Sequence, residues 1–260
     1  MAESLPLSLC IITLNAAHDL PGCLESARFA ADTVVVDSGS RDDTVEVAQR
    51  LGARVIDHPF DGFGAQKQFA VAAALHDWVL CLDADERVTP ELASAIAGVF
   101  ARDNPGASAF AVARRNRFMG RWLHHGEGYP DWNVRLFDRR WARWSDDVVH
   151  ERVIVDGHAA RIDGDLLHAS AESLSDYIAK QNRYTTLQAV AMHRQGRKAS
   201  FALIALAPIA RFLRLYFIRF GFLDGTAGFA HIAVGCFGSF LKYAKLRALN
   251  AANSDTAGVE

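Results

Sequence analysis

The stretch WVLCLDADER, residues Trp78–Arg87, decides the predicted fold. Its first five residues are mostly apolar, which is typical of a buried strand in a parallel sheet that is covered on both faces. Three carboxylates follow within four residues, at Asp83, Asp85 and Glu86. Burying unpaired charges in an apolar core is too costly, so these side chains must face water, a cation or a ligand. Open α/β sheets bind their ligands at the carboxyl ends of such strands.

The pair Asp83 and Asp85 flanks one small residue, and two carboxylates in this spacing can hold a hard divalent cation such as Mg²⁺ or Mn²⁺. The same stretch can also be interpreted as a solvated loop before a helix, because Thr89 suits an N-cap and Pro90 suits a first helical turn. An Asp-X-Asp motif alone does not decide between these interpretations.

Strand and helix patterns alternate along the first hundred residues. Strands are predicted at 7–14, 33–36, 54–57 and 78–82, and helices at 20–30, 42–51, 65–75 and 90–101. This alternation predicts an α/β fold with a doubly wound, mostly parallel sheet and right-handed connections. Neither the GxGxxG nor the GxxxxGK[ST] pattern occurs in the chain.

Three polar residues each follow a predicted strand: Asn15, Asp37 and Asp83. Because the carboxyl ends of parallel strands meet at one edge, we expect these residues to converge, and a nucleotide could lie across that edge. Its phosphates would need a metal ion and a cationic side chain such as Lys67. That lysine could equally be a solvated residue on the surface of a helix.

Residues 109–169 are rich in Arg, Trp and His, with short strands expected at 110–114, 134–137 and 152–155. Arginine forks suit phosphate or carboxylate, and aromatic faces suit sugar rings. We therefore expect Arg115, Trp132 and Arg135 to contact an acceptor substrate, although some residues of this stretch must pack into a small core of their own.

A second acidic stretch, DDVVHE at residues 146–151, suggests a general base, because a carboxylate beside a histidine can take a proton. The candidates are Asp146, Asp147 and Glu151. An ion pair at a sheet edge is the alternative. His168 follows a short apolar run and is either a core histidine or a further metal ligand.

The charge is distributed unevenly along the 260-residue chain, although its net charge is only −2. Residues 177–250 contain eleven Lys or Arg and one acid, so this segment carries +10 and the remainder −12. The four cysteines are scattered, as in reduced cytosolic proteins, and we expect no signal peptide at the N-terminus. A basic, apolar C-terminal part favours an anionic membrane surface as a partner.

The C-terminal part predicts a helix over 173–195 and then a helical hairpin. Its uncharged runs, Ala199–Ala210 and Gly225–Leu241, are shorter than the roughly 20 residues that span a bilayer. We expect a hairpin lying in one leaflet, with arginines at headgroup level, or alternatively two helices packed on a soluble body. The predicted organisation is an α/β domain at 1–170, divided near residue 105 into nucleotide and acceptor halves. The membrane-associated helices follow at 171–250, and a disordered tail at 251–260.

Together these landmarks resemble the family 2 inverting glycosyltransferases of GT-A fold over about residues 7–167. The resemblance rests on VVVDSGSRDDT (34–44), GFGAQKQFA (62–70) and LDADER (82–87). Further segments are similar to those of bacterial lipopolysaccharide core β-1,4-glucosyltransferases that modify inner-core heptose: RRNRFMGRW (114–122), YPDWNVRLF (129–137), VHERV (149–153) and GFLDG (221–225). One departure is Ala16, where the family usually has Glu, and this leaves the nucleotide unassigned.

The resemblance implies a role for each candidate on the donor side. The nucleoside base would be held by Thr13, Asn15 and Asp37. Lys67 would neutralise phosphate, and Asp83 would contact the ribose or the metal ion. Asp85 would bind a divalent cation, and His168 would complete the metal or leaving-group site.

On the acceptor side, the resemblance implies Glu151 as the base, with Asp147 and Asp146 in reserve. It implies a single displacement that moves a hexose, from UDP-glucose or a similar donor, to a glycolipid at the cytoplasmic face of the bacterial inner membrane. No nucleic-acid partner is expected. A polyprenyl-phosphate glycosyltransferase, a nucleotidyltransferase and a non-catalytic membrane-bound scaffold are the alternatives.

Overall fold

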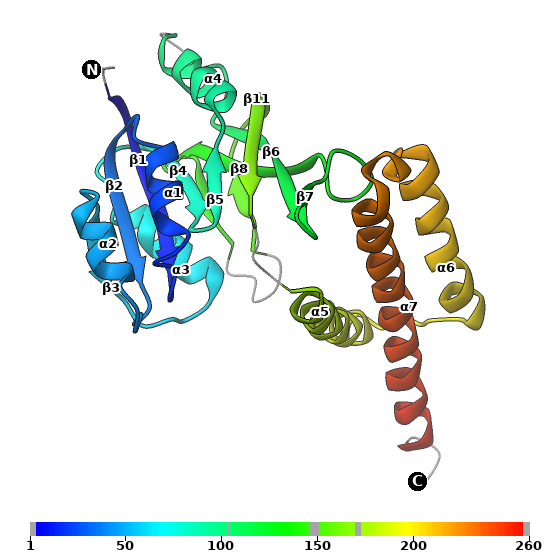
Figure 1. Cartoon of the computed structure of the whole chain (residues 1–260). Coiled ribbons are helices and arrows are strands. Elements are labelled where there is room, and N and C mark those ends of the chain that lie inside the picture. The colour runs from blue at the N-terminus through cyan, green and yellow to red at the C-terminus, as the bar shows by residue number, and fades with distance from the viewer. Residues whose placement is uncertain (1–3, 103–104, 146–150, 170–172, 257–260) are drawn as a thin grey trace. The chain divides into compact units, whose positions relative to one another are not determined.

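The computed structural model describes residues 4–102, 105–145, 151–169 and 173–256. The chain forms two compact units (Figure 1). Unit 1 contains Met1–Arg115 and Asp131–Ala169, and unit 2 contains Asn116–Pro130 and Ser170–Glu260. The segment 116–130, which the sequence places in the acceptor half of the α/β domain, belongs to the same unit as the C-terminal helices.

The first half of unit 1 alternates strands and helices as predicted. Its elements are β1 (Leu5–Thr13), α1 (Leu20–Ser26), β2 (Ala30–Asp37), α2 (Thr44–Arg50), β3 (Arg54–Asp57), α3 (Phe63–Ala72) and β4 (Trp78–Asp83). Strands β3, β2, β1 and β4 lie side by side in that order and are all parallel. This part of the predicted sheet is confirmed.

The second half of the sheet is antiparallel. Its elements are β5 (Glu86–Val88), α4 (Pro90–Phe100), β6 (Ala109–Phe118), β8 (Asp131–Asp138) and β11 (Ala159–His168). The sheet continues from β4 through β8, β6 and β11 to β5. The pairs β4–β8, β6–β8 and β11–β5 are antiparallel, so the predicted α/β class is confirmed but the sheet is mixed and not mostly parallel. A separate hairpin joins β9 (Ala142–Trp144) to β10 (Val153–Val155).

The central strands β1 and β4 are buried on both faces. In β1, Leu9 and Ile11 pack in a cluster with α1, α2 and α4, whereas Cys10 packs on the other face with α3. Helix α3 is fixed at both ends. Gly64 lies so close to the carbonyl of Ser145 that a side chain there would overlap it, and the Arg139 guanidinium donates to the last carbonyls of the helix.

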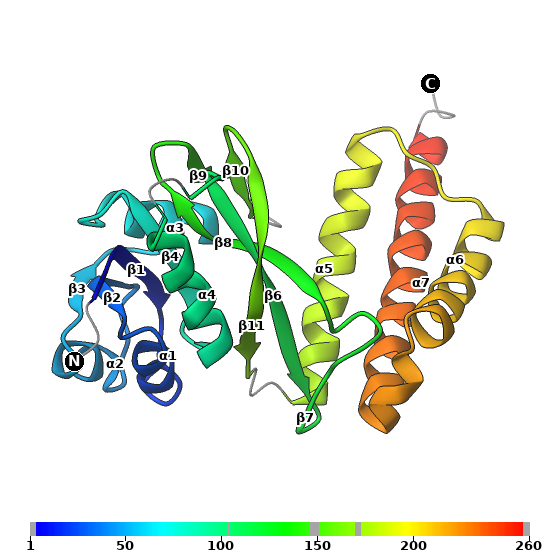
Figure 2. The same ribbon diagram turned by 90° about the horizontal axis from the view of Figure 1, so that it is seen from above.

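Unit 2 contains α5 (Leu174–Arg194), α6 (Phe201–Leu213) and α7 (Gly225–Thr256), which Figure 2 shows as long helices. A π-helical turn, η1 (Arg214–Ile218), and a 3₁₀ turn, η2 (Gly221–Asp224), join α6 to α7. Helix α7 continues to Thr256, into the segment that was expected to be disordered. Among the described residues, one helical stretch, Phe201–Ile218, is long and apolar enough to cross a membrane, judged by length and composition alone.

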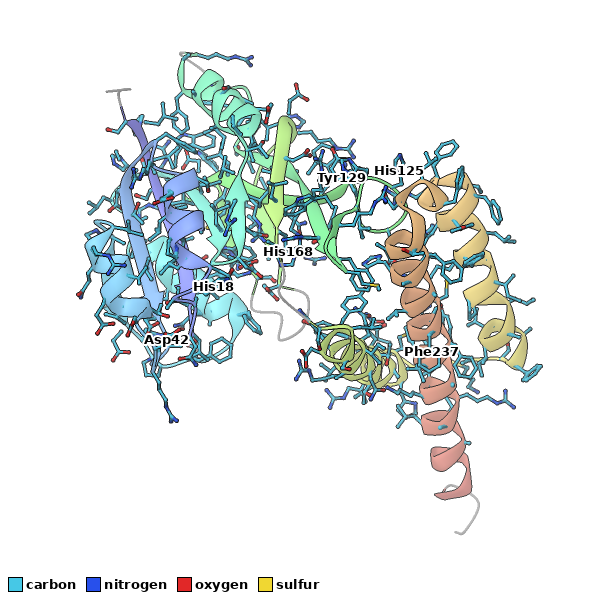
Figure 3. All side chains as sticks on the ribbon, viewed as in Figure 1. His18, Asp42, His125, Tyr129, His168 and Phe237 are labelled. Carbon is cyan, nitrogen blue, oxygen red and sulfur yellow. The ribbon has the colours of Figure 1, made fainter. Side chains whose placement is uncertain are left out.

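The segment 116–130 of unit 2 contains the short strand β7 (Arg121–Trp122), which pairs with the end of β6. It also contains a loop with His125 and Tyr129 (Figure 3). The carboxylate of Asp224 holds this loop. It accepts from the backbone N–H of His124 at 3.0 Å and of His125 at 2.8 Å. The segment is therefore tied to the C-terminal helices by a buried acidic side chain.

Candidate active site at the carboxyl edge of the sheet

The predicted convergence of the strand ends is present in unit 1. Thr13 is the register partner of Asp37, and Ile12 is that of Asp83, so β1, β2 and β4 end on the same edge. The Thr13 hydroxyl donates to Asp37 at 2.8 Å. Residues far apart in the sequence therefore lie together because parallel strands share one polarity.

Asp37 is buried and holds the loop that follows β2. Its carboxylate accepts from the backbone N–H groups of Gly39 and Ser40 at 3.0 and 2.7 Å, and from the Ser40 hydroxyl. Burial opposes ionisation of Asp37, but these hydrogen bonds outweigh it and lower the pKa of the carboxyl group. Asn15 adopts a positive φ of 52° and accepts from the N–H of Arg41. Contact of Thr13, Asn15 and Asp37 with a nucleoside stays a prediction.

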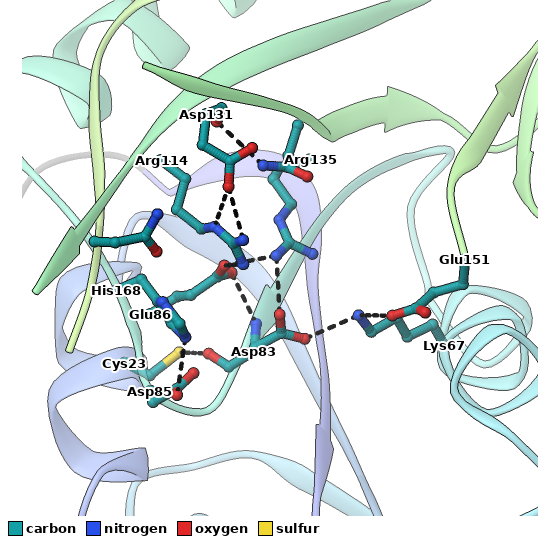
Figure 4. A network of polar contacts seen from close by, with 12 residues as sticks. Cys23, Lys67, Asp83, Asp85, Glu86, Arg114, Asp131, Arg135, Glu151 and His168 are labelled. Carbon is teal, nitrogen blue, oxygen red and sulfur yellow. Dashed lines mark hydrogen bonds and ion pairs between the residues drawn. The ribbon is translucent and has the colours of Figure 1, made fainter. Parts of the chain in front are cut away.

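Asp83 lies between two cations (Figure 4). One carboxylate oxygen is 3.0 Å from the ammonium of Lys67, and the other accepts from the guanidinium of Arg135 at 2.9 Å. Burial opposes ionisation of Asp83, but the charges of Arg135 and Lys67 outweigh it and hold the pKa well below its usual value. Asp83 is therefore an ionised carboxylate with both oxygens engaged.

The residue that anchors this cluster is Glu86, which is fully buried in β5. Its carboxylate accepts from Arg135 at 2.6 Å and from the backbone N–H of Asp83 at 3.0 Å. Arg114 lies 3.5 Å from the same carboxylate and also pairs with Asp131. The Asp-X-Asp pattern points to the two aspartates and gives no role to Glu86. The available signal for Glu86 is that three acids follow one buried strand, so that one of them can be buried and paired.

The position of Arg135 corrects an expectation. Its side chain is only 4% exposed and lies against Asp83 and Glu86. Burial disfavours its charged form, but the two carboxylates outweigh this and raise the pKa of the guanidinium. A side chain this deeply buried holds Asp83 and Glu86 in place, so we revise its role from acceptor contact to support of these two carboxylates.

Asp85 and His168 lie together, as their proposed common role requires. The β5–β11 pairing sets His168 opposite Glu86, and the Nε2 atom of His168 is 3.2 Å from the Asp85 carboxylate. Burial opposes ionisation of Asp85, but the hydrogen bond and charge of His168 outweigh it and lower its pKa. The pairing of β5 with β11 thus brings the His168 imidazole to the turn Asp83–Glu86, which we call the acidic loop.

The residues fit a divalent cation in part. Among the described residues, no group of three or more His, Cys, Asp or Glu side chains could hold a metal ion. Asp83, Asp85 and His168 therefore do not form the expected three-ligand centre, because Asp83 is occupied by Lys67 and Arg135. Mg²⁺ commonly binds one or two carboxylates together with substrate phosphates. The one-third exposed Asp85, with His168 beside it, fits that smaller set.

Lys67 links the acidic loop to the candidate base. Its ammonium is 3.0 Å from Asp83 and 3.2 Å from the carboxylate of Glu151, and it lies over the ring of Trp144 at 4.7 Å. The lysine is 8% exposed, so it is not the solvated helix residue that the sequence left open. The other base candidates, Asp146 and Asp147, lie outside the described residues.

The two remaining acceptor candidates occupy the antiparallel half of the sheet. Arg115 forms an ion pair with Asp165 of β11. Trp132 is 37% exposed and lies under the guanidinium of Arg161 at 4.6 Å. The exposed face of Trp132 suits a sugar ring, but contact of either residue with an acceptor stays a prediction.

Comparison with known proteins identifies the family of this chain. Residues 8–154 match glycosyl transferase family 2. An uncharacterised glycosyltransferase of Rickettsia typhi is 33% identical over 94% of this chain and 87% of its own length. The lipopolysaccharide core biosynthesis glycosyltransferase LpsC of Rhizobium meliloti is 32% identical over 95% of this chain and 93% of its own.

Among solved structures, glucosyl-3-phosphoglycerate synthase from Mycobacterium tuberculosis, in complex with Mn²⁺, UDP and glucosyl-3-phosphoglycerate, aligns with 44% of this chain and 44% of its own. The TM-score is 0.36 at 24% identity, which is too low to bear on the site. The family match and the full-length relatives confirm the predicted resemblance, and the chain belongs to glycosyl transferase family 2.

Proposed function

We propose that this glycosyltransferase moves a hexose, from UDP-glucose or a similar nucleotide sugar, to an inner-core heptose of lipopolysaccharide with inversion at the anomeric carbon. One observation carries the proposal: the ammonium of Lys67 pairs with Asp83 on the donor side and with Glu151, the candidate base. A donor diphosphate and an acceptor hydroxyl would then meet around one buried cation. The relative named for lipopolysaccharide core biosynthesis supports the acceptor class.

In this mechanism Glu151 accepts the proton of an acceptor hydroxyl. The hydroxyl oxygen forms the new bond to the anomeric carbon on the face opposite the nucleoside diphosphate, which leaves with the electron pair of the broken bond. Lys67 contributes a fixed positive charge near the developing negative charge. A divalent cation, held by Asp85 and His168, would supply Lewis-acid stabilisation of the leaving group.

The test is transfer by the purified full chain from UDP-glucose to a heptose-containing inner-core oligosaccharide, with the product configuration read by NMR. The Glu151→Gln variant should still bind the donor, seen as donor-induced thermal stabilisation, and should lose about 10²- to 10⁴-fold in kcat. Asp156→Asn, an exposed change in unit 1, is the matched control. Full transfer by Glu151→Gln would reject it as the base. Transfer to polyprenyl phosphate in place of the oligosaccharide would favour that alternative acceptor.

We also propose that unit 2 lies on the anionic cytoplasmic face of the inner membrane. Four apolar residues recur along one side of the α6–η1 stretch at spacings of three or four, and each is at least half exposed: Leu206, Ile209, Leu213 and Phe217. A helix that is apolar on its packed side and on its outer side requires an apolar environment outside. The basic charge of residues 177–250 would favour anionic headgroups.

Sedimentation with vesicles containing phosphatidylglycerol tests this surface. Wild-type protein should pellet with the vesicles, and Ile209→Asp should remain largely in the supernatant, because a carboxylate in the apolar stripe is costly to desolvate. Gln195→Asp adds the same charge at an exposed position beyond α5 and should pellet like the wild type. Equal pelleting of the two variants would contradict the membrane proposal.

A further inference from the structure

Two exposed phenylalanines stand at the beginning of α3. Phe60 is 51% and Phe63 54% exposed, although both side chains are large and aromatic. Their rings pack edge to face, with centroids 5.0 Å apart. The pair follows β3, whose last residue is the register partner of Asp37, so it belongs to the carboxyl edge of the sheet.

The backbone under this pair is firmly held. Gln66 is fully buried, and its amide donates to the carbonyl of His58 at 3.1 Å and to the hydroxyl of Ser38 at 3.0 Å. The ring of His58 lies 3.0 Å from the same amide group. Gly62 takes a φ of 125°, which favours glycine and turns the chain into the helix. An exposed aromatic pair on a fixed frame is arranged to contact something else.

The neighbours of the pair identify the side of the site on which it stands. Phe63 precedes Lys67 by four residues, so both lie on one face of α3, one turn apart. Gly64, which follows Phe63 directly, lies close to the carbonyl of Ser145 and to the Cβ atom of Glu151. The first turn of α3, which carries Phe63, therefore approaches the candidate base.

We propose that Phe60 and Phe63 form a platform that binds the ring of the acceptor sugar. This inference rests on the proposed function, because a base must lie within hydrogen-bond reach of the hydroxyl that it deprotonates. The acceptor ring must then be next to Glu151, and the apolar C–H face of a sugar ring matches an exposed aromatic surface. Such a platform sets specificity for the acceptor without touching the reacting atoms.

The experiment compares Phe63→Ala and Phe60→Ala with the wild type on a lipid-free heptose-containing oligosaccharide. The KM for this acceptor should rise about tenfold in each variant, the size expected for losing one aromatic contact. Donor-induced thermal stabilisation should be unchanged, and Phe63→Tyr should behave as the wild type. Trp141→Ala removes an aromatic residue of similar exposure, which follows β8 at the opposite end of β4, and should leave KM unchanged.

Three results would overturn the platform: an unchanged acceptor KM, loss of donor stabilisation in the variants, or an effect seen only with a lipid-bearing acceptor. The second would assign the pair to the nucleotide, and the third to an acyl chain. If the wild type transfers no sugar at all, the proposed function fails independently. The platform is then judged by binding of the oligosaccharide itself, observed by NMR line broadening, and equal binding by wild type and Phe63→Ala would reject it.

Discussion

The two units each bury a carboxylate, but they satisfy it differently. In unit 1, the fully buried Glu86 is balanced mainly by the guanidinium groups of Arg135 and Arg114. In unit 2, Asp224 is equally buried, and it accepts from two successive backbone N–H groups and from the ring of His125 at 3.2 Å. Charged side chains balance one carboxylate, and the main chain satisfies the other.

This difference separates a network that can respond to a ligand, around Glu86, from a purely structural contact, around Asp224. Side-chain cations can change partners when a charged ligand arrives, because only torsions need to move. Backbone N–H groups cannot leave Asp224 without deforming the loop that carries them. We therefore expect the network around Glu86 to respond to ligands and that around Asp224 to respond only to unfolding.

The largest predicted effect is that of Glu86→Gln. Removing this charge leaves Arg135 buried with Asp83 as its remaining partner, and breaking a buried ion pair costs about 3–5 kcal/mol of unfolding free energy. Urea unfolding followed by circular dichroism measures the change. Glu91→Gln, an exposed change in the first turn of α4, is the control and should have little effect. A loss below about 1 kcal/mol for Glu86→Gln would show that the pair is not what holds the acidic loop.

A smaller effect is expected for Asp224→Asn. The amide can accept from one N–H group, but its own N–H₂ would face the other, so the variant should lose about 1–3 kcal/mol. The same unfolding experiment measures it, with Asp163→Asn as the exposed control. A cost equal to that of Glu86→Gln would remove the distinction between the two carboxylates.

The smallest effect concerns Asp32, which combines both modes of satisfaction. It pairs with Arg54 at 2.9 Å and accepts from the Ser8 hydroxyl and the backbone N–H of Leu75. Burial opposes its ionisation, but these partners outweigh it and lower the pKa below 3.8.

The carboxylate of Asp32 therefore contributes stability that is fully present above its unfolded pKa and is lost as the pH falls through its folded pKa. Asp32→Asn should flatten the loss of stability below about pH 4, as measured by urea unfolding at several pH values. A pH profile identical to that of the wild type would contradict this assignment.

The parallel half of unit 1 was predictable because each of its strands carries its own apolar signal. The strand expected at 54–57 matches β3, and the one at 78–82 lacks only the last residue of β4. The pair β5 and β11 was missed. β5 has only three residues, and β11 contains several polar residues among its apolar ones. Neither strand therefore has a clear apolar pattern of its own, and each depends on pairing with its distant partner.

The candidate site was predictable as far as it depends on strand ends. Asp37 and Asp83 follow from topology, because parallel strands share one edge, whereas the sequence leaves open whether Lys67 faces the site or the solvent. The burial of Arg135 does not follow, since its partner Glu86 lies 49 residues away on a strand that the pattern does not predict. Charge pairs across the sheet are set by packing.

The two fixed ends of α3 have a consequence for how Lys67 serves its two carboxylates. With Gly64 pressed on a carbonyl at one end and Arg139 closing the other, the helix cannot slide along its axis. Any exchange of Lys67 between its two carboxylates must occur by rotation about its own side-chain bonds. Because the ammonium already lies 3.0 Å from Asp83 and 3.2 Å from Glu151, positive charge can shift between the two carboxylates without movement of the helix or of a domain.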